Sequence, residues 1–459
     1  MKTVTTLLCL ASLSGGLLCA CDEAVTPPRL YRAEDGQMKD REGHVLLLRG
    51  MNLSGTAKTA EDHLMDLTAD DVDRLLGSGV NVARLLTFWK AITPEQGQVD
   101  AAYLTAYQER VTRLTDAGLY VVVDMHQDVW GVPFASHGAP DWACPPELTE
   151  GYEPQSPWWL NYTTRQVRAC FDHFWATPEL QAAFTQAWVA VAAQVCSDER
   201  VLGFDLFNEP YPGTALFEPE WDNDVLLPFY LQLMDALEAV CPGRLYFLEP
   251  SAAYVLGLAT PMRLPEAVRD RAVFAGHFYP TEVHEPGAEG YSGDATALEE
   301  RVLDVFGFYL DDGVPVWNGE WGGITTNPNF EAYVRDVNTL FARHHISATL
   351  WDYYRSDGGF AFLDEDGQRK PVFDAVYGSP MPTRLPSPPA VEPDYGARQI
   401  TLTFACVPGR EVTLLLPAQG CDCTAAPSGA LAGPLAGAGF VTTACATAQE
   451  VQLVCGCPP

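Results

Sequence analysis

Two glutamates stand at the ends of apolar runs of the kind that form buried strands. The run FDLFNEP ends in Asn208 and Glu209, and the run VPVWNGEW carries Glu320 near its end. A pair of carboxylates about 5–5.5 Å apart can hydrolyse a glycosidic bond with retention of configuration. In that reaction we expect Glu320 to attack the anomeric carbon. Glu209 would protonate the leaving oxygen and then take a proton from the incoming water.

The neighbours of these carboxylates suit the same chemistry. Asn208 can hydrogen-bond the sugar 2-hydroxyl, a contact that strengthens in the transition state. Arg84 and Tyr279 can keep Glu320 ionised, through a nearby positive charge and a hydrogen bond. Other polar side chains also end apolar runs: Arg49, Asn52, Asp124, His126, His277 and Trp351. Trp351 can stack on a sugar face or fill the core.

The pattern of apolar runs predicts the element that must position these residues. Eight short apolar runs alternate with amphipathic segments between residues 40 and 375: HVLLLRGMN, VNVARLL, LYVVVDMH, VLGFDLFNE, RLYFLEP, AVFAGHFY, VPVWNGEW and ISATLWDY. Strands each followed by a helix indicate a parallel sheet buried on both faces. Eight such units predict a (β/α)₈ (TIM) barrel of the α/β class, whose strand ends open onto one face. A doubly wound sheet is the alternative, but no Gly-rich phosphate loop follows the first run.

The intervening segments predict helices, because their apolar residues recur at spacings of three and four. They are Asp70–Leu76, Ala102–Asp116, Pro178–Cys196, Val225–Val240, Leu298–Leu310 and Phe330–Arg343.

The composition changes near residue 380. A proline-rich stretch, GSPMPTRLPSPPAVEPDYG, is typical of a linker or domain edge. Four short β-rich runs and six cysteines follow it. We therefore expect a catalytic domain over residues 21–385 and a small Cys-rich β-sandwich over residues 386–459, held by up to three disulfides.

The N-terminal residues 1–20 have the features of a signal peptide. Lys2 precedes an apolar segment too short to span a bilayer, and small residues follow it. Cys21 then stands where a bacterial lipoprotein would be lipidated, with ordinary cleavage after Ala20 as the alternative. Setting aside Cys21 and the two cysteines before it leaves ten of thirteen, a set of four and a set of six. These even numbers favour disulfides and an exported protein, either secreted or anchored by lipid at the cell envelope.

Charge and histidine spacing exclude several classes of partner. The net charge of −32 argues against nucleic acid and against electrostatic binding to anionic membranes. The nine histidines show no metal-ligand spacing, so we expect no metal and no cofactor. We expect a monomer.

The residues at the strand ends together resemble glycoside hydrolase family 5. The matching segments span most of residues 45–355: RGMN, Arg84, MH at 125–126, NEP at 208–210, HFY at 277–279, GEWG at 319–322 and Trp351. A closer resemblance, to the endoglycoceramidases, rests on further segments: Lys58 in NLSGTAK, DMHQDVWG at 124–131, HGAPDWA at 137–143 and CFDHFW at 170–175. That group cuts the β-bond between an oligosaccharide or glucose and ceramide.

The resemblance implies roles for named residues. Glu209 would be the acid/base and Glu320 the nucleophile. The first sugar would be held by Lys58, His126, Asp128, Asn208, Tyr279 and Trp351, and the substrate-binding residues would also include Arg84 and His277. A glycosphingolipid would be the partner of the site.

An amphiphilic substrate requires an apolar surface near the cleft. The long segment after His126 holds Trp130, Phe134, Trp142, Trp158 and Trp159. These aromatics could form a wall for the ceramide chains and bring the 130–160 loop onto a membrane, or they could pack the loop onto the barrel. Two other hypotheses remain: a β-glucanase or steryl-β-glucoside hydrolase on the same barrel, and an inactive barrel that binds glycolipid at the cell surface.

Overall fold

The computed structural model describes residues 29–458, so the predicted signal peptide and Cys21 lie outside the described residues. Eight parallel strands close into a barrel in the order β10-β11-β4-β5-β6-β7-β8-β9, which confirms the predicted TIM barrel. The strands are β4 (Arg49–Leu53), β5 (Val82–Thr87), β6 (Tyr120–Met125), β7 (Val201–Asp205), β8 (Leu245–Leu248), β9 (Ala272–Phe278), β10 (Val316–Trp321) and β11 (Ser347–Leu350).

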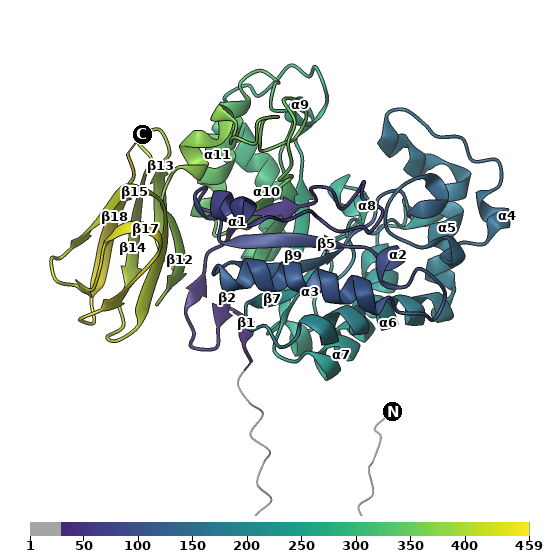
Figure 1. The fold of residues 1–459 in the computed structure, drawn as a ribbon, viewed down its shortest axis with the longest axis horizontal. Helices are drawn as coiled ribbons and strands as arrows, with labels where there is room; N and C mark the ends of the chain where they lie inside the picture. The colour runs from purple at the N-terminus through teal and green to yellow at the C-terminus, as the bar shows by residue number, and fades with distance from the viewer. Residues whose placement is uncertain (1–28, 459) are drawn as a thin grey trace, which may run out of the picture.

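The helices surround the barrel (Figure 1), and the larger ones lie near their predicted positions, apart from the helix over Arg165–Ala176, which was not predicted. The larger ones are α1 (Ala69–Leu76), α3 (Ala101–Asp116), α5 (Arg165–Ala176), α6 (Pro178–Val195), α7 (Leu227–Val240), α10 (Ala295–Asp311) and α11 (Phe330–Arg343). Short ones lie in the connections: α2 (Trp89–Ile92), α4 (Pro146–Thr149), α8 (Ala252–Val255), α9 (Thr281–His284) and α12 (Asp374–Tyr377). Aspartates 100 and 294 cap α3 and α10 by accepting hydrogen bonds from backbone amides of the first turn. No helix among residues 29–458 is both long and apolar enough to cross a membrane.

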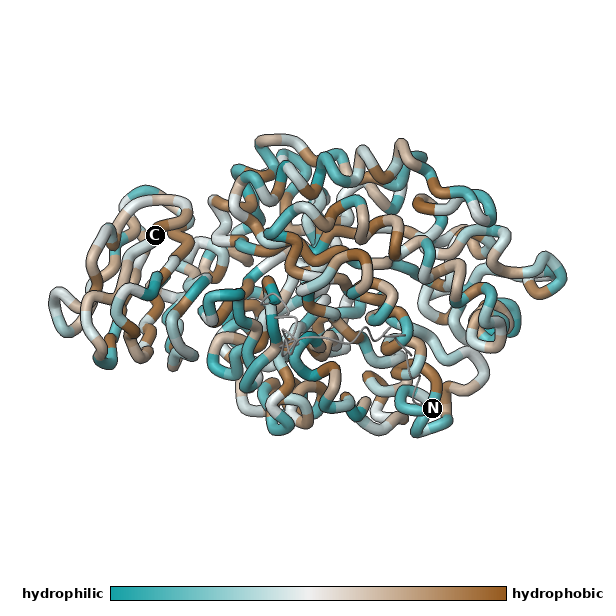
Figure 2. The backbone as a smooth tube through the Cα atoms, turned by 90° about the horizontal axis from the view of Figure 1, so that it is seen from below, coloured by the Kyte–Doolittle hydropathy of each residue, from teal (hydrophilic) through white to brown (hydrophobic). Residues whose placement is uncertain are grey.

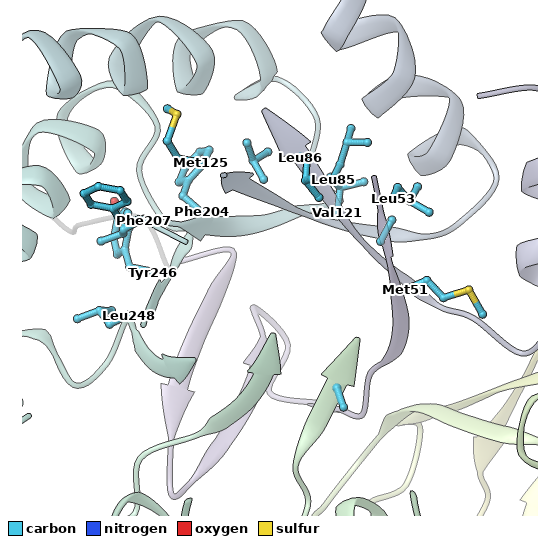
Figure 3. Close-up of a cluster of buried hydrophobic side chains, with 14 of the residues drawn as sticks. Met51, Leu53, Leu85, Leu86, Val121, Met125, Phe204, Phe207, Tyr246 and Leu248 are labelled. Carbon is cyan, nitrogen blue, oxygen red and sulfur yellow. The ribbon is translucent and has the colours of Figure 1, made fainter. Parts of the chain in front are cut away.

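Apolar side chains fill the space on both sides of the barrel wall. Outward-facing residues of several strands, among them Met51, Leu85 and Phe204, pack against the helices (Figure 3). Inward-facing residues such as Val82, Val122 and Phe247 fill the lower interior. In Figure 2 the hydrophobic segments concentrate in the interior of the larger body. The barrel is therefore a packed core and not a pore, and its polar residues gather at one end.

A ten-stranded antiparallel sheet lies beside the barrel (Figure 1). Its long strand β15 (Glu411–Ala426) pairs with β12 (Met381–Leu385), β17 (Ala436–Cys445) and β18 (Glu450–Gly456). The strands of this sheet enclose an apolar core separate from that of the barrel. The other C-terminal strands are β13 (Ala390–Asp394), β14 (Gln399–Ala405) and β16 (Leu431–Ala432). Each of five disulfides joins two cysteines of the same expected set, the set of four or the set of six: Cys144–Cys170, Cys196–Cys241, Cys406–Cys445, Cys421–Cys457 and Cys423–Cys455.

Two features of the antiparallel sheet differ from the sequence-based expectations. The proline-rich stretch contains strands β12 and β13, because the φ angle of proline suits an extended chain wherever no amide is needed for the ladder. The first apolar run is divided between two sheets: Val45–Leu46 (β3) pairs with β12, whereas Arg49–Leu53 enters the barrel. Strands β1 (Tyr31–Glu34), β2 (Gln37–Asp40) and β3 thus join the sheet from before residue 386.

The close approach of β7 and β8 depends on Gly203. A Cβ atom at this position would overlap the carbonyl oxygen of Leu245 on the neighbouring strand. We expect Gly203→Ala to lower the free energy of unfolding by about 1–3 kcal/mol, because a well-packed core must shift to admit the methyl group. Urea unfolding monitored by circular dichroism measures this loss.

Gly307 is a matched control for this substitution. It lies in α10, where a Cβ would meet nothing closer than Leu303 Cβ at 3.6 Å. Gly307→Ala should raise stability by about 0.4–1 kcal/mol. Equal stability of the two variants would contradict the packing argument.

Candidate active site

The carboxyl ends of the barrel strands surround a cleft of about 860 Å³. Nine of the ten site residues expected from the sequence line it: Lys58, His126, Asp128, Asn208, Glu209, His277, Tyr279, Glu320 and Trp351. The tenth, Arg84, is fully buried and contacts several of them from below. The structure therefore brings all ten residues together.

Glu209 and Glu320 face one another across the cleft floor. Carboxylate oxygens of the two residues lie within 4.8 Å of each other. Their surroundings differ, because the side chain of Glu209 is 36% exposed and that of Glu320 only 7%. The separation fits the retaining arrangement and is too short for the inverting one, which needs about 6.5–9.5 Å.

Arg84 supplies positive charge beneath the cleft. Its Nη1 donates to Glu320 Oε1 at 2.8 Å, its Nη2 to Glu249 Oε1 at 2.9 Å, and its Nε to Asp205 Oδ2 at 2.8 Å. Asp124 Oδ1 lies 3.0 Å from Nη2. The guanidinium has five N–H donors in a fixed plane, so one side chain can satisfy acceptors from several strands.

The charge around Glu320 favours its ionised form. Burial by itself would raise the pKa of Glu320, but the positive charges of His277 and Arg84 lower it below its usual value. Tyr279 Oη donates a hydrogen bond to Glu320 Oε2 at 2.9 Å. Glu320 is thus held as a carboxylate within the apolar barrel.

His277 connects the two facing glutamates with a third one. Its Nδ1 lies 2.8 Å from Glu209 Oε1 and 3.7 Å from Glu320 Oε2, and its Nε2 lies 3.2 Å from Glu249 Oε1. Burial by itself would lower the pKa of His277, but the carboxylates of Glu249 and Glu320 raise it well above its usual value. Gly319 permits this arrangement, because a Cβ there would lie 2.9 Å from His277 Nε2.

Lys58, Asp128, His126 and Trp351 form a second group at the side of the cleft. Lys58 Nζ pairs with Asp128 Oδ2 at 2.7 Å and lies 4.2 Å from the centre of the Trp351 ring. The rings of His126 and Trp351 stack with 5.4 Å between their centres. Burial by itself would raise the pKa of Asp128, but Lys58 and His126 lower it. A charged pair beside an indole face can hydrogen-bond sugar hydroxyls while the ring packs on the sugar.

Asn208 is fixed by the protein on both sides of its amide. Its Oδ1 accepts from Arg84 Nη2 at 2.8 Å, and its Nδ2 donates to the backbone oxygen of Gln127 at 3.0 Å. An amide nitrogen has two N–H groups, so one remains for a ligand in the cleft.

Two groups of residues in the site have their oxygen or nitrogen atoms close enough together to hold a cation. These are Asp124, Asp205 and Glu249 in one group, and Glu209, His277 and Glu320 in another. In both groups protein cations already lie among the carboxylates, Arg84 in the first and His277 in the second.

Sequence reasoning missed four residues of the site: Gln127, Asp205, Glu249 and Asp352. Burial raises the pKa of Asp352 to about 7. Burial and the charge of Glu249 raise the pKa of Asp205 well above its usual value. A period of two could have identified Glu249, because it follows the inward-facing Leu245 and Phe247 as Arg84 follows Val82.

The comparisons with known proteins agree on one family. Residues 40–357 match the family model described as Cellulase (glycosyl hydrolase family 5). Endoglycoceramidase I of Rhodococcus hoagii (strain 103S) is 30% identical over 265 residues, which cover 55% of this chain and 54% of that protein. An endoglycoceramidase of Cyanea nozakii is 28% identical over 239 residues, 46% of this chain and 47% of that protein. The chain spans about half the length of these curated relatives.

Solved structures extend the similarity to nearly the whole chain. Endo-glycoceramidase II from Rhodococcus sp., in complex with a five-membered iminocyclitol, has a TM-score of 0.78 at 26% identity. The superposition covers 92% of this chain and 99% of that one. Sterylglucosidase 1 of Cryptococcus neoformans has a TM-score of 0.72 at 14% identity, which shows a shared fold.

The dependence of the site on Arg84 can be tested by Arg84→Met. The variant leaves buried carboxylates without their cation, so we expect the free energy of unfolding to fall by about 3–5 kcal/mol. Without Arg84 the pKa of Glu320 rises, and the folded variant binds protons that the unfolded chain releases. The loss relative to the unaltered protein should therefore grow from pH 5 to pH 8. Urea unfolding at the two pH values measures it.

Arg335→Met serves as the control for Arg84→Met. Arg335 forms an exposed pair with Glu331 four residues earlier on α11. Its removal should change stability by less than about 0.5 kcal/mol at either pH. A pH-independent loss in Arg84→Met would contradict the electrostatic role of the guanidinium.

Proposed function

The chain belongs to glycosyl hydrolase family 5, and from this premise we propose that it hydrolyses the β-glycosidic bond between the sugar and the ceramide of glycosphingolipids. The separation of less than 4.8 Å between oxygens of Glu209 and Glu320 carries the proposal, because it matches a retaining mechanism. The endoglycoceramidases among its relatives support the choice of aglycone.

In the first step Glu320 acts as the nucleophile. Its carboxylate oxygen attacks the anomeric carbon, and the bond from that carbon to the ceramide oxygen breaks. Glu209 gives its proton to the departing oxygen, which leaves as the ceramide hydroxyl. Arg84, His277 and Tyr279 keep Glu320 ionised before the attack.

In the second step water releases the sugar. Glu209, now a carboxylate, takes a proton from a water molecule whose oxygen attacks the anomeric carbon. The ester bond to Glu320 breaks, and both glutamates return to their starting states with the configuration retained. Asn208, with its free N–H, is placed to hydrogen-bond the 2-hydroxyl, while Lys58, Asp128, His126 and Trp351 hold the first sugar.

We assign the ceramide chains to the apolar rim on the Glu209 side. Trp158 and Trp159 line the cleft and are 51% and 43% exposed, whereas Trp130 and Phe134 of the same segment are buried. Leu256 also lines the cleft and is 64% exposed. It lies in the segment that follows strand β8, where the backbone N–H of Ala252 donates to the backbone oxygen of Pro210, the residue after Glu209. Exposed apolar side chains next to a cleft mark a lipid or partner surface. This rim is where the 130–160 loop would touch a membrane or micelle.

The location and organisation of the chain complete the proposal. Five disulfides support an exported protein, with residues 1–20 as its signal peptide and Cys21 as a candidate lipidation site. All residues that line the cleft lie within 21–385, which supports assigning catalysis to that segment and none to 386–459. The proposal treats the protein as a monomer.

Product analysis tests the proposed reaction. Residues 22–459 are incubated with a panel of glycosphingolipids in detergent, beside cello-oligosaccharides and a steryl glucoside, and products are identified by mass spectrometry. We expect intact oligosaccharide and ceramide. Glu320→Gln lacks the nucleophilic charge and should lose activity by at least about 10⁴-fold. Cleavage of only the glucan or only the steryl glucoside would keep the two-carboxylate mechanism and reject ceramide. Binding without any cleavage would indicate an inactive glycolipid-binding barrel.

The role of the rim is tested by replacing both Trp158 and Trp159 with alanine. Their loss removes apolar contacts worth about 1–3 kcal/mol, so kcat/KM for a glycosphingolipid in mixed micelles should fall about tenfold or more. A soluble aryl glycoside has no lipid chains, and its kcat/KM should stay within about twofold. Phe308→Ala is the control, because Phe308 is an exposed aromatic on helix α10 outside the cleft. An equal fall for both substrates would contradict a lipid-binding rim.

A further inference from the structure

The backbone of Glu209 has an unfavourable conformation. Its φ angle is +45°, in the left-handed region that residues other than glycine seldom adopt. Such a residue costs about 1–3 kcal/mol and persists only where the surroundings hold it. The surroundings of Glu209 must therefore contain groups that fix its backbone.

Glu249 holds the amide side of this residue. Its Oε2 accepts a hydrogen bond from the backbone N–H of Glu209 at 2.7 Å. Its Oε1 accepts from Arg84 Nη2 at 2.9 Å and lies 3.2 Å from His277 Nε2. Glu249 is almost fully buried, so these contacts fix its carboxylate in one position.

Gln127 holds the carbonyl side. Its Nε2 donates to the backbone oxygens of Asn208 and Glu209, both at 3.0 Å. Its Oε1 accepts from the backbone N–H of Trp130 at 2.9 Å, which fixes the orientation of the amide. Gln127 is also buried. The two side chains thus hydrogen-bond the peptide groups before and after the Cα atom of Glu209.

The same contacts extend to the Glu209 carboxylate. His277 Nδ1 lies 2.8 Å from Glu209 Oε1, and Glu249 lies on the other nitrogen of that ring. A displacement of about 1 Å in a catalytic group can reduce a rate by 10²-fold. The direction of the Glu209 side chain depends on the φ angle that Gln127 and Glu249 maintain.

We propose that Gln127 and Glu249 are positioning residues for proton transfer, which clamp the left-handed backbone of Glu209 so that its carboxylate meets the leaving-group oxygen. Neither touches the reacting atoms in this role. The inference rests on the proposed function, in which Glu209 is the acid/base.

Two leaving groups separate this role from a general structural one. Departure of ceramide requires a proton from Glu209, whereas departure of fluoride from a glycosyl fluoride requires none. In Glu249→Gln and Gln127→Met, kcat/KM for the glycosphingolipid should fall about 10- to 100-fold. For the glycosyl fluoride of the same sugar, kcat/KM reports only the first step and should stay within about threefold.

The substitutions nearly keep the side-chain size and remove hydrogen bonds to the Glu209 backbone. Glu249→Gln also removes a negative charge beside Arg84 and His277, whereas Gln127→Met leaves the charge of the site unchanged. A glutamine at position 249 has only one oxygen, which cannot accept both from the Glu209 N–H and from Arg84 and His277. A methionine at position 127 has no N–H to donate to the backbone oxygens. Gln98→Met is the matched control, because Gln98 bonds only to exposed Glu95. It should turn over both substrates like the unaltered protein. Thermal unfolding verifies that each variant folds.

A parallel loss on both substrates would overturn the proposal, and so would unchanged turnover of the glycosphingolipid. If the unaltered protein turns over neither substrate, the proposed function fails, and crystal structures of the variants still decide the clamp. Glu209 should leave the left-handed region in at least one variant. A φ near +45° in both would overturn the clamp independently of activity.

Discussion

The buried guanidinium of Arg84 is the constraint on which the site depends. A charge inside an apolar barrel is costly unless it is paired and hydrogen-bonded. The acceptors of Arg84 lie on strands β4, β7 and β10 or just beyond β7 and β8, and to satisfy each of them separately inside the barrel would carry a similar cost. One planar cation with five donors satisfies them together, and a lysine, with a single charged atom, could not reach them all. The polar layer at the barrel mouth therefore exists as a unit.

The barrel geometry explains why this layer lies directly on an apolar one. Inward-facing residues alternate along each strand, so Val82 and Arg84 occupy successive levels, as do Phe247 and Glu249. Strand β10 departs from this alternation, with a register shift between Asn318 and Glu320 against strand β9. Such a bulge redirects a side chain at a strand end. It accompanies the placement of Glu320 beside Arg84 and Tyr279, with Gly319 leaving room for His277.

The sequence predicted the barrel strands and the polar residues at their ends because both depend on local patterns, whereas Lys58 and Asp128 were expected only from the family resemblance. Apolar runs have the strand period, and the residues at their carboxyl ends must converge in a closed barrel. Glu249 was missed although it ends such a run, because a lone carboxylate at a strand end is commonly part of a structural ion pair, and its inward direction follows only from the period of two along β8. Gln127 was missed because its role depends on a backbone angle at residue 209, which no sequence spacing encodes. The proline-rich strand β12 was missed because it pairs with β3, more than 300 residues earlier, and with β15, and no local pattern shows such partners; β13 pairs with the adjacent β14.

The unequal exposure of the two facing glutamates gives them different chemistry within the proposed mechanism. A nucleophile must stay ionised, and Glu320 is buried against Arg84, His277 and Tyr279, which favour its anion whatever the solvent does. An acid/base must exchange protons with a leaving group and with water, which requires an open side. Glu209 forms no hydrogen bond or ion pair with Arg84, and its carboxylate is partly exposed in the cleft. Its backbone is held on the other side by the neutral Gln127 and the charged Glu249. Rigidity at the backbone and access at the carboxylate are compatible because they involve opposite ends of the same residue.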